Sequence, residues 1–310
     1  MNDSPSGPTF LGAPLDLEPG AAPADYAFLG VRYGAPYDMG NVCPPAAAAP
    51  QAVRAASVVY RDDLEHYDFD LGGPLFPEAA GRRLVDCGDV PGDPRDLAGN
   101  LERATAAVRS IVAARAVPLM LGGDHAIPPL VVRGLNDAEP LDVLHIDAHL
   151  DYRDEVGGVR DGYSSPIRRL RELPWVRTIV QVGLRDIGSA RPAEVEAALT
   201  AGNVLVRAEE VHERGVDWIV ESLPADARVY ITIDIDGLDP SCAPGTLWPA
   251  PGGLLFWQAA RLVRGLARRC RLAGMDVCEF VPARDPQGHT ALVITRLLMI
   301  AMGSSARRRA

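Results

Sequence analysis

The sequence contains no lysine: all 31 of its cationic residues are arginine, and 41 acidic residues leave a formal charge of −10. The missing lysine carries no mechanistic weight, but the acidic balance does, because nucleic acids and anionic membranes repel such a chain. Apolar residues fill 47% of the 310 positions, which excludes intrinsic disorder and allows a large core. We expect a small-molecule ligand, and a cation suits the charge.

The sequence also lacks a pattern of paired cysteines. Its five cysteines are widely spaced, and no two form a C-x-x-C pair. Neither a disulfide framework nor a thiolate zinc site is therefore predicted, and a reducing compartment fits. The first ten residues lack a basic segment followed by an apolar one, and Arg296 interrupts the longest apolar stretch near the C-terminus. We expect a cytoplasmic protein that is neither exported nor membrane-spanning.

The chain divides into a short arm and one long domain. Residues 1–24 are rich in proline, glycine and acid, and should form an arm on the surface or against a neighbouring subunit. The domain at 25–310 should have ordered structure from residue 27. Apolar runs predict strands at 27–31, 84–89, 117–123, 141–149, 178–184, 228–236 and 273–280. Amphipathic segments predict helices at 96–115, 192–201, 256–270 and 288–303. This alternation predicts a three-layer α/β/α fold with a mainly parallel sheet.

Acidic residues and histidines gather where three of these strands end. They are His125, Asp147, His149, Asp151, Asp234 and Asp236. Because parallel strands end at one edge of a sheet, the three groups can converge there. Residues two apart in an extended segment point to the same side, so Asp147, His149 and Asp151 should project together. The same spacing aligns Asp234 with Asp236, and one dense acidic pocket is predicted.

Four carboxylates in a buried pocket would repel one another and lose their hydration, so a cationic centre must balance them. Two divalent ions supply that charge. A carboxylate-rich set with a minority of imidazole suits Mn²⁺, although Ni²⁺ or Co²⁺ could replace it. Two ions about 3.5–4 Å apart could also hold a hydroxide ready at neutral pH. We therefore predict two Mn²⁺ ions per chain.

Each motif alone has an ordinary structural interpretation. A single His-x-Asp is most often a hydrogen-bonded loop, and an Asp-x-Asp after a strand can cap a helix or bind Mg²⁺. Three such motifs at matching positions make that interpretation improbable. His145 shares the strand face of His149 but lies in an apolar run, so we interpret it as a core histidine. His66 and His212 fall in probable surface segments and have no companions.

The chain resembles the ureohydrolase family, which includes arginase, agmatinase and guanidinobutyrase. The matching strings run in the family's order along almost the whole chain: GGDHAI at 122–127, DAHLD at 147–151, DIDGLDPSCAPGT at 234–246, PGG at 251–253 and MDVCEFVP at 275–282. The APGT and PGG strings look closer to agmatinase-like members than to true arginases. The resemblance implies a ureohydrolase catalytic domain with a binuclear manganese centre. It implies hydrolysis of a guanidino compound, most closely agmatine, to urea and an amine, in a homo-oligomer such as a trimer or hexamer.

The resemblance also assigns roles to residues. One ion would be bound by His125 and Asp151, the other by His149 and Asp236, and both would share Asp147 and Asp234. Asp151 would in addition accept a hydrogen bond from the attacking hydroxide. Glu279, at the end of the 273–280 strand, would hold the substrate, because a carboxylate pairs with a guanidinium strongly and in a fixed direction.

Three departures from the family concern the substrate. Tyr163-Ser164 stand where many relatives carry a His-Gly whose histidine is thought to shuttle a proton, so we expect the proton to pass through Asp151 while Tyr163 lines the pocket. CPPAAAAP at 43–50 replaces a motif that usually reads RPGAR followed by GP, and Leu247-Trp248 adds bulk at the pocket mouth. Arg153, two positions beyond Asp151, could bind a substrate carboxylate and favour 4-guanidinobutyrate over agmatine.

Two other kinds of function remain open. A catalytically weak relative could keep the metals and serve in binding or assembly. An enzyme of the deacetylase type would need only one metal and a pair of histidines. The full six-ligand set together with Glu279 favours the metal-dependent guanidino hydrolase.

Overall fold

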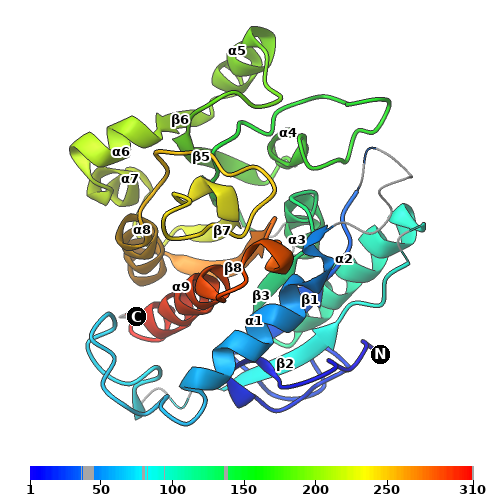
Figure 1. Cartoon of the computed structure of the whole chain (residues 1–310), viewed down its shortest axis with the longest axis vertical. Helices are drawn as coiled ribbons and strands as arrows, with labels where there is room; N and C mark the ends of the chain where they lie inside the picture. The colour runs from blue at the N-terminus through cyan, green and yellow to red at the C-terminus, as the bar shows by residue number, and fades with distance from the viewer. Residues whose placement is uncertain are drawn as a thin grey trace.

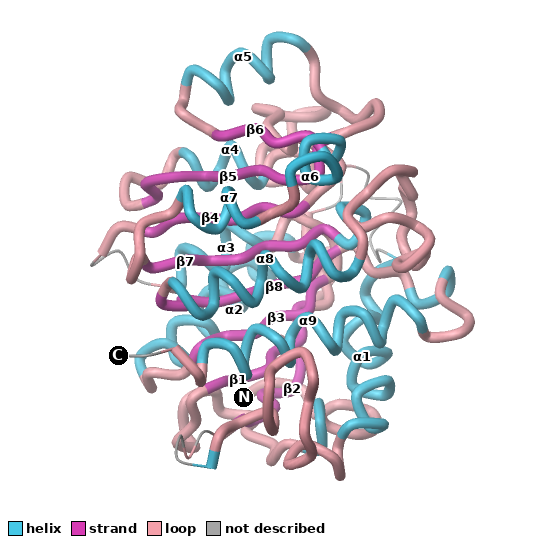
Figure 2. The backbone as a smooth tube through the Cα atoms, turned by 90° about the vertical axis from the view of Figure 1, so that its left-hand side faces the viewer, coloured by secondary structure: helices cyan, strands magenta, loops and turns pink. Residues whose placement is uncertain are grey.

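A computed structural model describes residues 1–35, 37, 45–78, 81, 83–93, 95–135 and 139–308. These residues build one eight-stranded sheet in which every strand pairing is parallel. The strands are β1 (Tyr26–Val31), β2 (Leu84–Asp89), β3 (Val117–Gly122), β4 (Leu141–Ile146), β5 (Val176–Leu184), β6 (Val204–Arg207), β7 (Arg228–Asp234) and β8 (Arg271–Cys278). Their order is β2-β1-β3-β8-β7-β4-β5-β6, with β8 and β7 at the centre (Figure 2).

Helices cover both faces of the sheet (Figure 1). One core contains side chains of α1 (Ala49–Ser57), α6 (Ala208–Arg214), α7 (Asp217–Ser222), α8 (Phe256–Arg269) and α9 (His289–Ser305). The other contains side chains of α2 (Leu97–Ala113), α3 (Pro128–Gly134), α4 (Pro166–Arg171) and α5 (Pro192–Thr200). Strands covered on both sides need mostly apolar residues, as in β1, which reads YAFLGV and is buried along its whole length. The predicted three-layer α/β/α fold is confirmed, and the sheet is wholly parallel in these ranges.

The N-terminal segment is more than a surface arm. Asp3 pairs with Asp89 at the end of β2, and the Asp3 N–H donates to its carbonyl oxygen at 2.8 Å. Phe10 is fully buried and stacks on Phe28 of β1, with ring centroids 4.4 Å apart. The expectation that ordered structure begins at residue 27 is therefore wrong, because a few apolar residues anchor the segment to the sheet.

The strand predictions missed β6, which lies at the edge of the sheet. Its sequence VLVR has an apolar run of only three residues, and only Val206 is buried. Helices α1, α3, α4, α6 and α7 were also missed. None of the described helices is long and apolar enough to cross a membrane.

Candidate metal centre

The site lies at the carboxyl edge of the sheet, where β3, β4 and β7 end. The two strands were expected to run to residues 149 and 236, but β4 ends at Ile146 and β7 at Asp234. Asp236 lies in a 3-10 turn at Ile235–Gly237, and Asp151 adopts a positive φ of 49°. The side chains converge through tight turns rather than through strand alternation. A Cβ atom at Gly237 would lie 2.7 Å from the Asp147 N atom, so this approach requires glycine.

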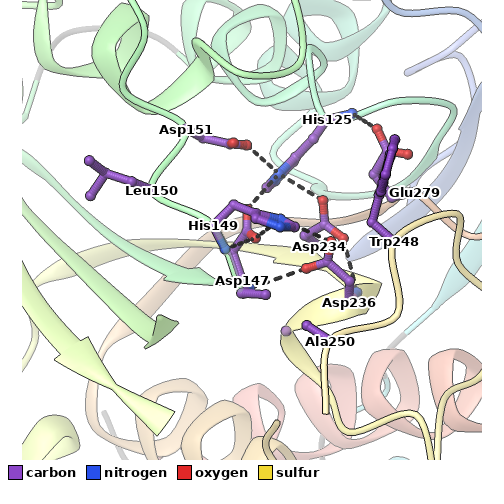
Figure 3. A network of polar contacts seen from close by, with 12 residues as sticks. His125, Asp147, His149, Leu150, Asp151, Asp234, Asp236, Trp248, Ala250 and Glu279 are labelled. Carbon is purple, nitrogen blue, oxygen red and sulfur yellow. Dashed lines mark hydrogen bonds and ion pairs between the residues drawn. The ribbon is translucent and has the colours of Figure 1, made fainter. Parts of the chain in front are cut away.

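One half of the site forms around His125. Its Nδ1 lies 3.2 Å from Oδ2 of Asp147, 3.2 Å from Oδ2 of Asp151 and 3.3 Å from Oδ2 of Asp234 (Figure 3). The imidazole and the Asp147 side chain are each about 1% exposed. Three carboxylates from two strand ends thus face one nitrogen atom in the interior.

The other half forms around His149. Its Nδ1 lies 3.1 Å from Oδ2 of Asp236 and 3.4 Å from Oδ1 of Asp147. Asp147 therefore faces both histidines, one with each oxygen. Gly188 packs beside the ring, where a Cβ atom would lie 2.5 Å from His149 Cδ2. The side chain of His149 is 20% exposed, which makes this half the more accessible one.

The electrostatics of the cluster are those of crowded acids. Burial, followed by the charge of Asp147, raises the pKa of Asp151 to about 7. Burial and the charges of Asp236 and Asp147 raise the pKa of Asp234 to about 8. Burial opposes a charge on His149, but the carboxylates of Asp147 and Asp236 outweigh it and raise the pKa of that histidine to about 12. These side chains therefore compete with one another for the same protons. Metal ions bound at the cluster would displace those protons.

The residues fit a pair of divalent ions. Nδ1 of His125 and Oδ2 of Asp147 are buried without a hydrogen-bond partner, and none of the ion pairs of the described residues links an arginine to the cluster. Three sets of candidate ligand atoms each lie within 4.8 Å of one another. One set comprises His125, His145, Asp147 and Asp151, and a second comprises Asp147, His149 and Asp236. The third set, His125, Asp276 and Cys278, lies below the cluster. Carboxylate and imidazole donors in these proportions are the ligands that Mn²⁺ and similar ions prefer.

His145 is the buried core histidine that the sequence predicts. Gln181 Nε2 donates to its Nδ1 at 3.1 Å, and its Nε2 lies 2.8 Å from Oδ2 of Asp147. Burial lowers the pKa of His145 and keeps it neutral. The His145 imidazole therefore contacts Asp147 and helps to hold that carboxylate in place. Of the other three histidines, His66 is exposed near Asp63, and His289 begins α9. His212 lies close to carbonyl oxygens, with its Nε2 3.0 Å from the carbonyl oxygen of Gly253.

Glu279 follows β8 and lies beside His125. Its Oε1 accepts the His125 N–H at 2.9 Å, and its own N–H donates to Gly123 at 2.9 Å. Its φ of 62° is unfavourable for a side chain with a Cβ atom, so the backbone stores strain to aim this carboxylate. Burial and the charges of Asp234 and Asp124 raise the pKa of Glu279 well above its ordinary range. The carboxylate therefore lies directly beside the ligand cluster.

The three remaining predicted side chains differ in where they lie. Tyr163 packs against Tyr37, with ring centroids 4.5 Å apart. Burial, and after it the nearby Tyr37 and Glu279, raise the pKa of the Tyr163 phenol. Trp248 is 66% exposed and lies on the Glu279 side of the cluster (Figure 3). Arg153 does not stand free: its Nε lies 3.2 Å from Oε1 of Glu194.

Most of the altered 43–50 segment can be placed. Residues 43 and 44 lie outside the described residues, Pro45–Ala48 forms a 3-10 turn, and Ala49 begins α1. Two polar groups below the cluster escaped the sequence analysis, namely Thr232 and Asp276. Thr232 precedes Asp234 by two on the same strand, and that spacing could have identified it. Asp276 lies across from Thr232 on β8, which only strand register reveals.

Comparisons with known proteins agree with this geometry. The model of the arginase family matches residues 30–303. Guanidinopropionase of Pseudomonas aeruginosa is 35% identical and covers 97% of this chain and 93% of its own length. The mitochondrial agmatinase of Gallus gallus is 33% identical over 92% of this chain and 82% of its own length. The crystal structure of proclavaminate amidinohydrolase from Streptomyces clavuligerus superposes with a TM-score of 0.85 at 30% identity, over 98% of both chains.

The family match spans nearly all of the sheet, and the buried His and Asp side chains gather at its carboxyl edge as a metal site requires. The chain therefore belongs to the arginase family, the ureohydrolases, as an amidinohydrolase with a buried His and Asp metal site.

Proposed function

We propose that this protein hydrolyses a small guanidino compound to urea and an amine at a centre of two Mn²⁺ ions, and that agmatine is its first substrate. The observation that carries the proposal is the position of Glu279. This carboxylate lies beside the ligand cluster, and its Oε1 accepts the His125 N–H at 2.9 Å. A planar cation bound to it would present its carbon atom to the cluster.

The roles of the side chains follow from this arrangement. Divalent ions at the cluster would supply an activated water molecule at neutral pH. Glu279 binds and orients the guanidinium, and Asp151 takes a proton from the attacking water. Asp151 then returns that proton to the amine nitrogen as the C–N bond breaks, which yields urea and the amine. Glu279 and Asp151 are thus the two carboxylates that act on the reactants. Asp151 would also bind an ion, together with His125, Asp147, His149, Asp234 and Asp236.

Agmatine has a positively charged tail, and three features favour such a tail. The chain is acidic overall. Trp248 and Tyr163 offer aromatic faces, which attract cations. Arg153 is held by Glu194 and by the Ser189 carbonyl oxygen, 3.2 Å from its Nη1, so its guanidinium is already engaged. We therefore infer that Arg153 fixes the segment after Asp151 rather than binding a substrate carboxylate.

A guanidino acid is the second candidate, because guanidinopropionase is among the relatives and shares 35% identity. For such a substrate Arg153 would have to exchange Glu194 for the substrate carboxylate. Arg153→Ala would then change the ranking of carboxylated against cationic substrates. An unchanged ranking would confine the arginine to its structural contact.

Two further proposals have separate grounds. The resemblance to the family leads us to infer that the protein works as a homo-oligomer, a trimer or hexamer. The scattered cysteines lead us to infer a reducing compartment, the cytoplasm. A catalytically weak binding protein is the least economical alternative, because a crowded acidic cluster is costly to keep without ions.

The test is a urea-release assay of the manganese-loaded protein on agmatine, arginine, 4-guanidinobutyrate, 3-guanidinopropionate and guanidine. We expect the highest kcat/KM on agmatine. A higher value on one of the two acids would transfer the assignment to that acid. Absence of urea from all five, with two ions bound, would contradict the proposed activity.

A further inference from the structure

Below the ligand cluster, a short chain of hydrogen bonds connects His125 to the sheet. His125 Nε2 lies 2.9 Å from the hydroxyl of Thr232 on β7, and that hydroxyl donates to Oδ1 of Asp276 on β8 at 2.9 Å. Thr232 and Asp276 stand opposite each other in the strand register. Both are 0% exposed, and His125 is 1% exposed. Thr232 and Asp276 are therefore fixed by the two central strands, β7 and β8. These side chains and His125 make no hydrogen bonds with solvent.

The direction of this chain can be worked out from the hydrogen count. A threonine hydroxyl carries one hydrogen, and Thr232 gives it to Asp276. The hydroxyl can then only accept from His125, so Nε2 must carry a hydrogen. Oδ1 of Asp276 also accepts the thiol hydrogen of Cys278, at 3.3 Å. Any proton on Asp276 therefore belongs on its unpartnered Oδ2, and the direction is the same in either protonation state.

The other ring nitrogen of His125, Nδ1, faces carboxylate oxygens instead of a hydroxyl group. Nδ1 of His125 has three carboxylate oxygens within 3.3 Å and no hydrogen-bond partner. With the hydrogen on Nε2, the neutral ring presents the Nδ1 lone pair to this group of oxygens. A metal ion shared with these oxygens suits that lone pair. Without an ion a proton would take its place, because burial opposes a charge on His125 but Asp147, Asp151 and Asp234 outweigh it and raise the pKa of that histidine well above its ordinary value.

We propose that Thr232, held by Asp276, is a positioning residue that fixes the ring orientation and tautomer of His125 for metal binding. The inference rests on the proposed role of His125 as a ligand. It goes beyond that role because it makes the affinity for one ion depend on the Thr232 hydroxyl, which contacts neither the ions nor the substrate. Partners of this kind typically change metal affinity 10–100-fold.

The test compares two variants of Thr232 by calorimetric titration of the chelator-treated protein with Mn²⁺. Thr232→Val keeps the shape and removes the hydroxyl, and it should weaken one of the two ions about 10–100-fold while leaving the other within about threefold. Thr232→Ser keeps the hydroxyl and should restore both affinities. Thr295→Val is the matched control, because Thr295 is equally buried but donates to Ala291 within α9. It should leave both affinities unchanged.

Three results would overturn the proposal: wild-type affinities in folded Thr232→Val, equal weakening of both ions, or a serine variant as weak as the valine variant. Because binding is measured without turnover, these failures are distinct from a failure to release urea. If Thr232→Val does not fold, nitrogen NMR of the wild type loaded with Zn²⁺ decides, with the His125 signals assigned through His125→Gln. A hydrogen on Nε2 of His125 supports the proposal, and a hydrogen on Nδ1 contradicts it.

Discussion

Two groups of buried aspartates lie in the same sheet, and they are neutralised in different ways. At the end of β2, Asp86 and Asp89 bind Arg54 of α1. The guanidinium donates to both oxygens of Asp86, at 2.8 and 2.9 Å, and to Oδ1 of Asp89 at 2.6 Å. At the ends of β4 and β7, the described residues supply only histidines to face the acids. The fold itself supplies the positive charge that neutralises Asp86 and Asp89. We infer that divalent ions supply it to the second group.

A structural acidic cluster can be distinguished from a functional one by the partners of its carboxylates. A buried carboxylate needs a counter-charge and hydrogen bonds. Asp86 has both, since it also accepts the N–H of Phe10 at 2.7 Å. Asp147 instead keeps an oxygen with no hydrogen-bond partner. A carboxylate left unsatisfied beside other acids therefore indicates a binding site.

The largest expected effect comes from Asp234→Ala, which removes a carboxylate near the centre of the second group. Both ions should be lost, and urea release should fall about 10³-fold or more, equivalent to roughly 4 kcal/mol of barrier. Metal analysis and kcat/KM measure the two effects together. Asp86 is no matched control, because it holds Arg54. Asp239→Ala, on the surface turn that follows, is preferable and should retain both ions. Retention of two ions in Asp234→Ala would contradict the account.

Breaking the first group should cost stability instead of activity. Arg54→Met leaves Asp86 and Asp89 buried without their cation, and the free energy of unfolding should fall by about 3–5 kcal/mol. Denaturant unfolding of the chelator-treated protein measures this. Arg61→Met, which removes an exposed partner of Asp62, should leave the unfolding midpoint unchanged. A loss of metal affinity without a loss of stability in Arg54→Met would reverse the roles given to the two groups.

The metal-free protein should become less stable as the pH rises from about 5 to 8. The folded-state pKa values of Asp151, about 7, and Asp234, about 8, lie above the ordinary value near 4. In this window the folded state holds protons that the unfolded state has released, so raising the pH favours unfolding. His149, with its pKa raised to about 12, acts in the same direction above about pH 6.5.

Thermal unfolding at several pH values, with and without Mn²⁺, tests this. The metal-loaded protein should lose the downward slope, because ions displace protons and bind more tightly at higher pH. Parallel slopes in both states would show that the second group is not where the ions bind.

The smallest expected effect is that of Tyr163→Phe. The phenol has a raised pKa and is a weak acid at neutral pH, so we predict that it lines the pocket. Its loss should reduce kcat by at most about tenfold, the effect of one modest hydrogen bond. Asp151→Asn should abolish turnover even where some metal remains. A drop of about 10³-fold for Tyr163→Phe, with metal content intact, would make the phenol an essential acid.

The sequence predicts the central strands because burial on both faces demands apolar runs. It fails for α1, α3 and α4, which carry proline in the first turn, at Pro50, Pro128 and Pro166. α3 and α4 are also only seven and six residues long, whereas α5 begins with Pro192 and was still predicted. Proline suggests a loop in a sequence, yet the first helical turn tolerates it because the N–H groups there have no helical partner. Strand β6 is missed because its apolar run of three residues is too short to indicate a strand.

The six predicted ligand residues converge as expected, although tight turns rather than extended strands bring them together. The contact between Arg153 and Glu194 could not be predicted from spacing, because Glu194 lies in α5, far along the chain. The support of His125 by Thr232 and Asp276 depends on strand register and on the direction of hydrogen bonds. Neither property is encoded in local spacing.

The most direct test of the central claim is a count of the divalent ions that complete the second acidic group. The chelator-treated protein is titrated with Mn²⁺ and then analysed for metal after gel filtration, with circular dichroism as a check on folding. The account predicts two ions per chain. One ion or none at saturating Mn²⁺, in a natively folded protein, would contradict it.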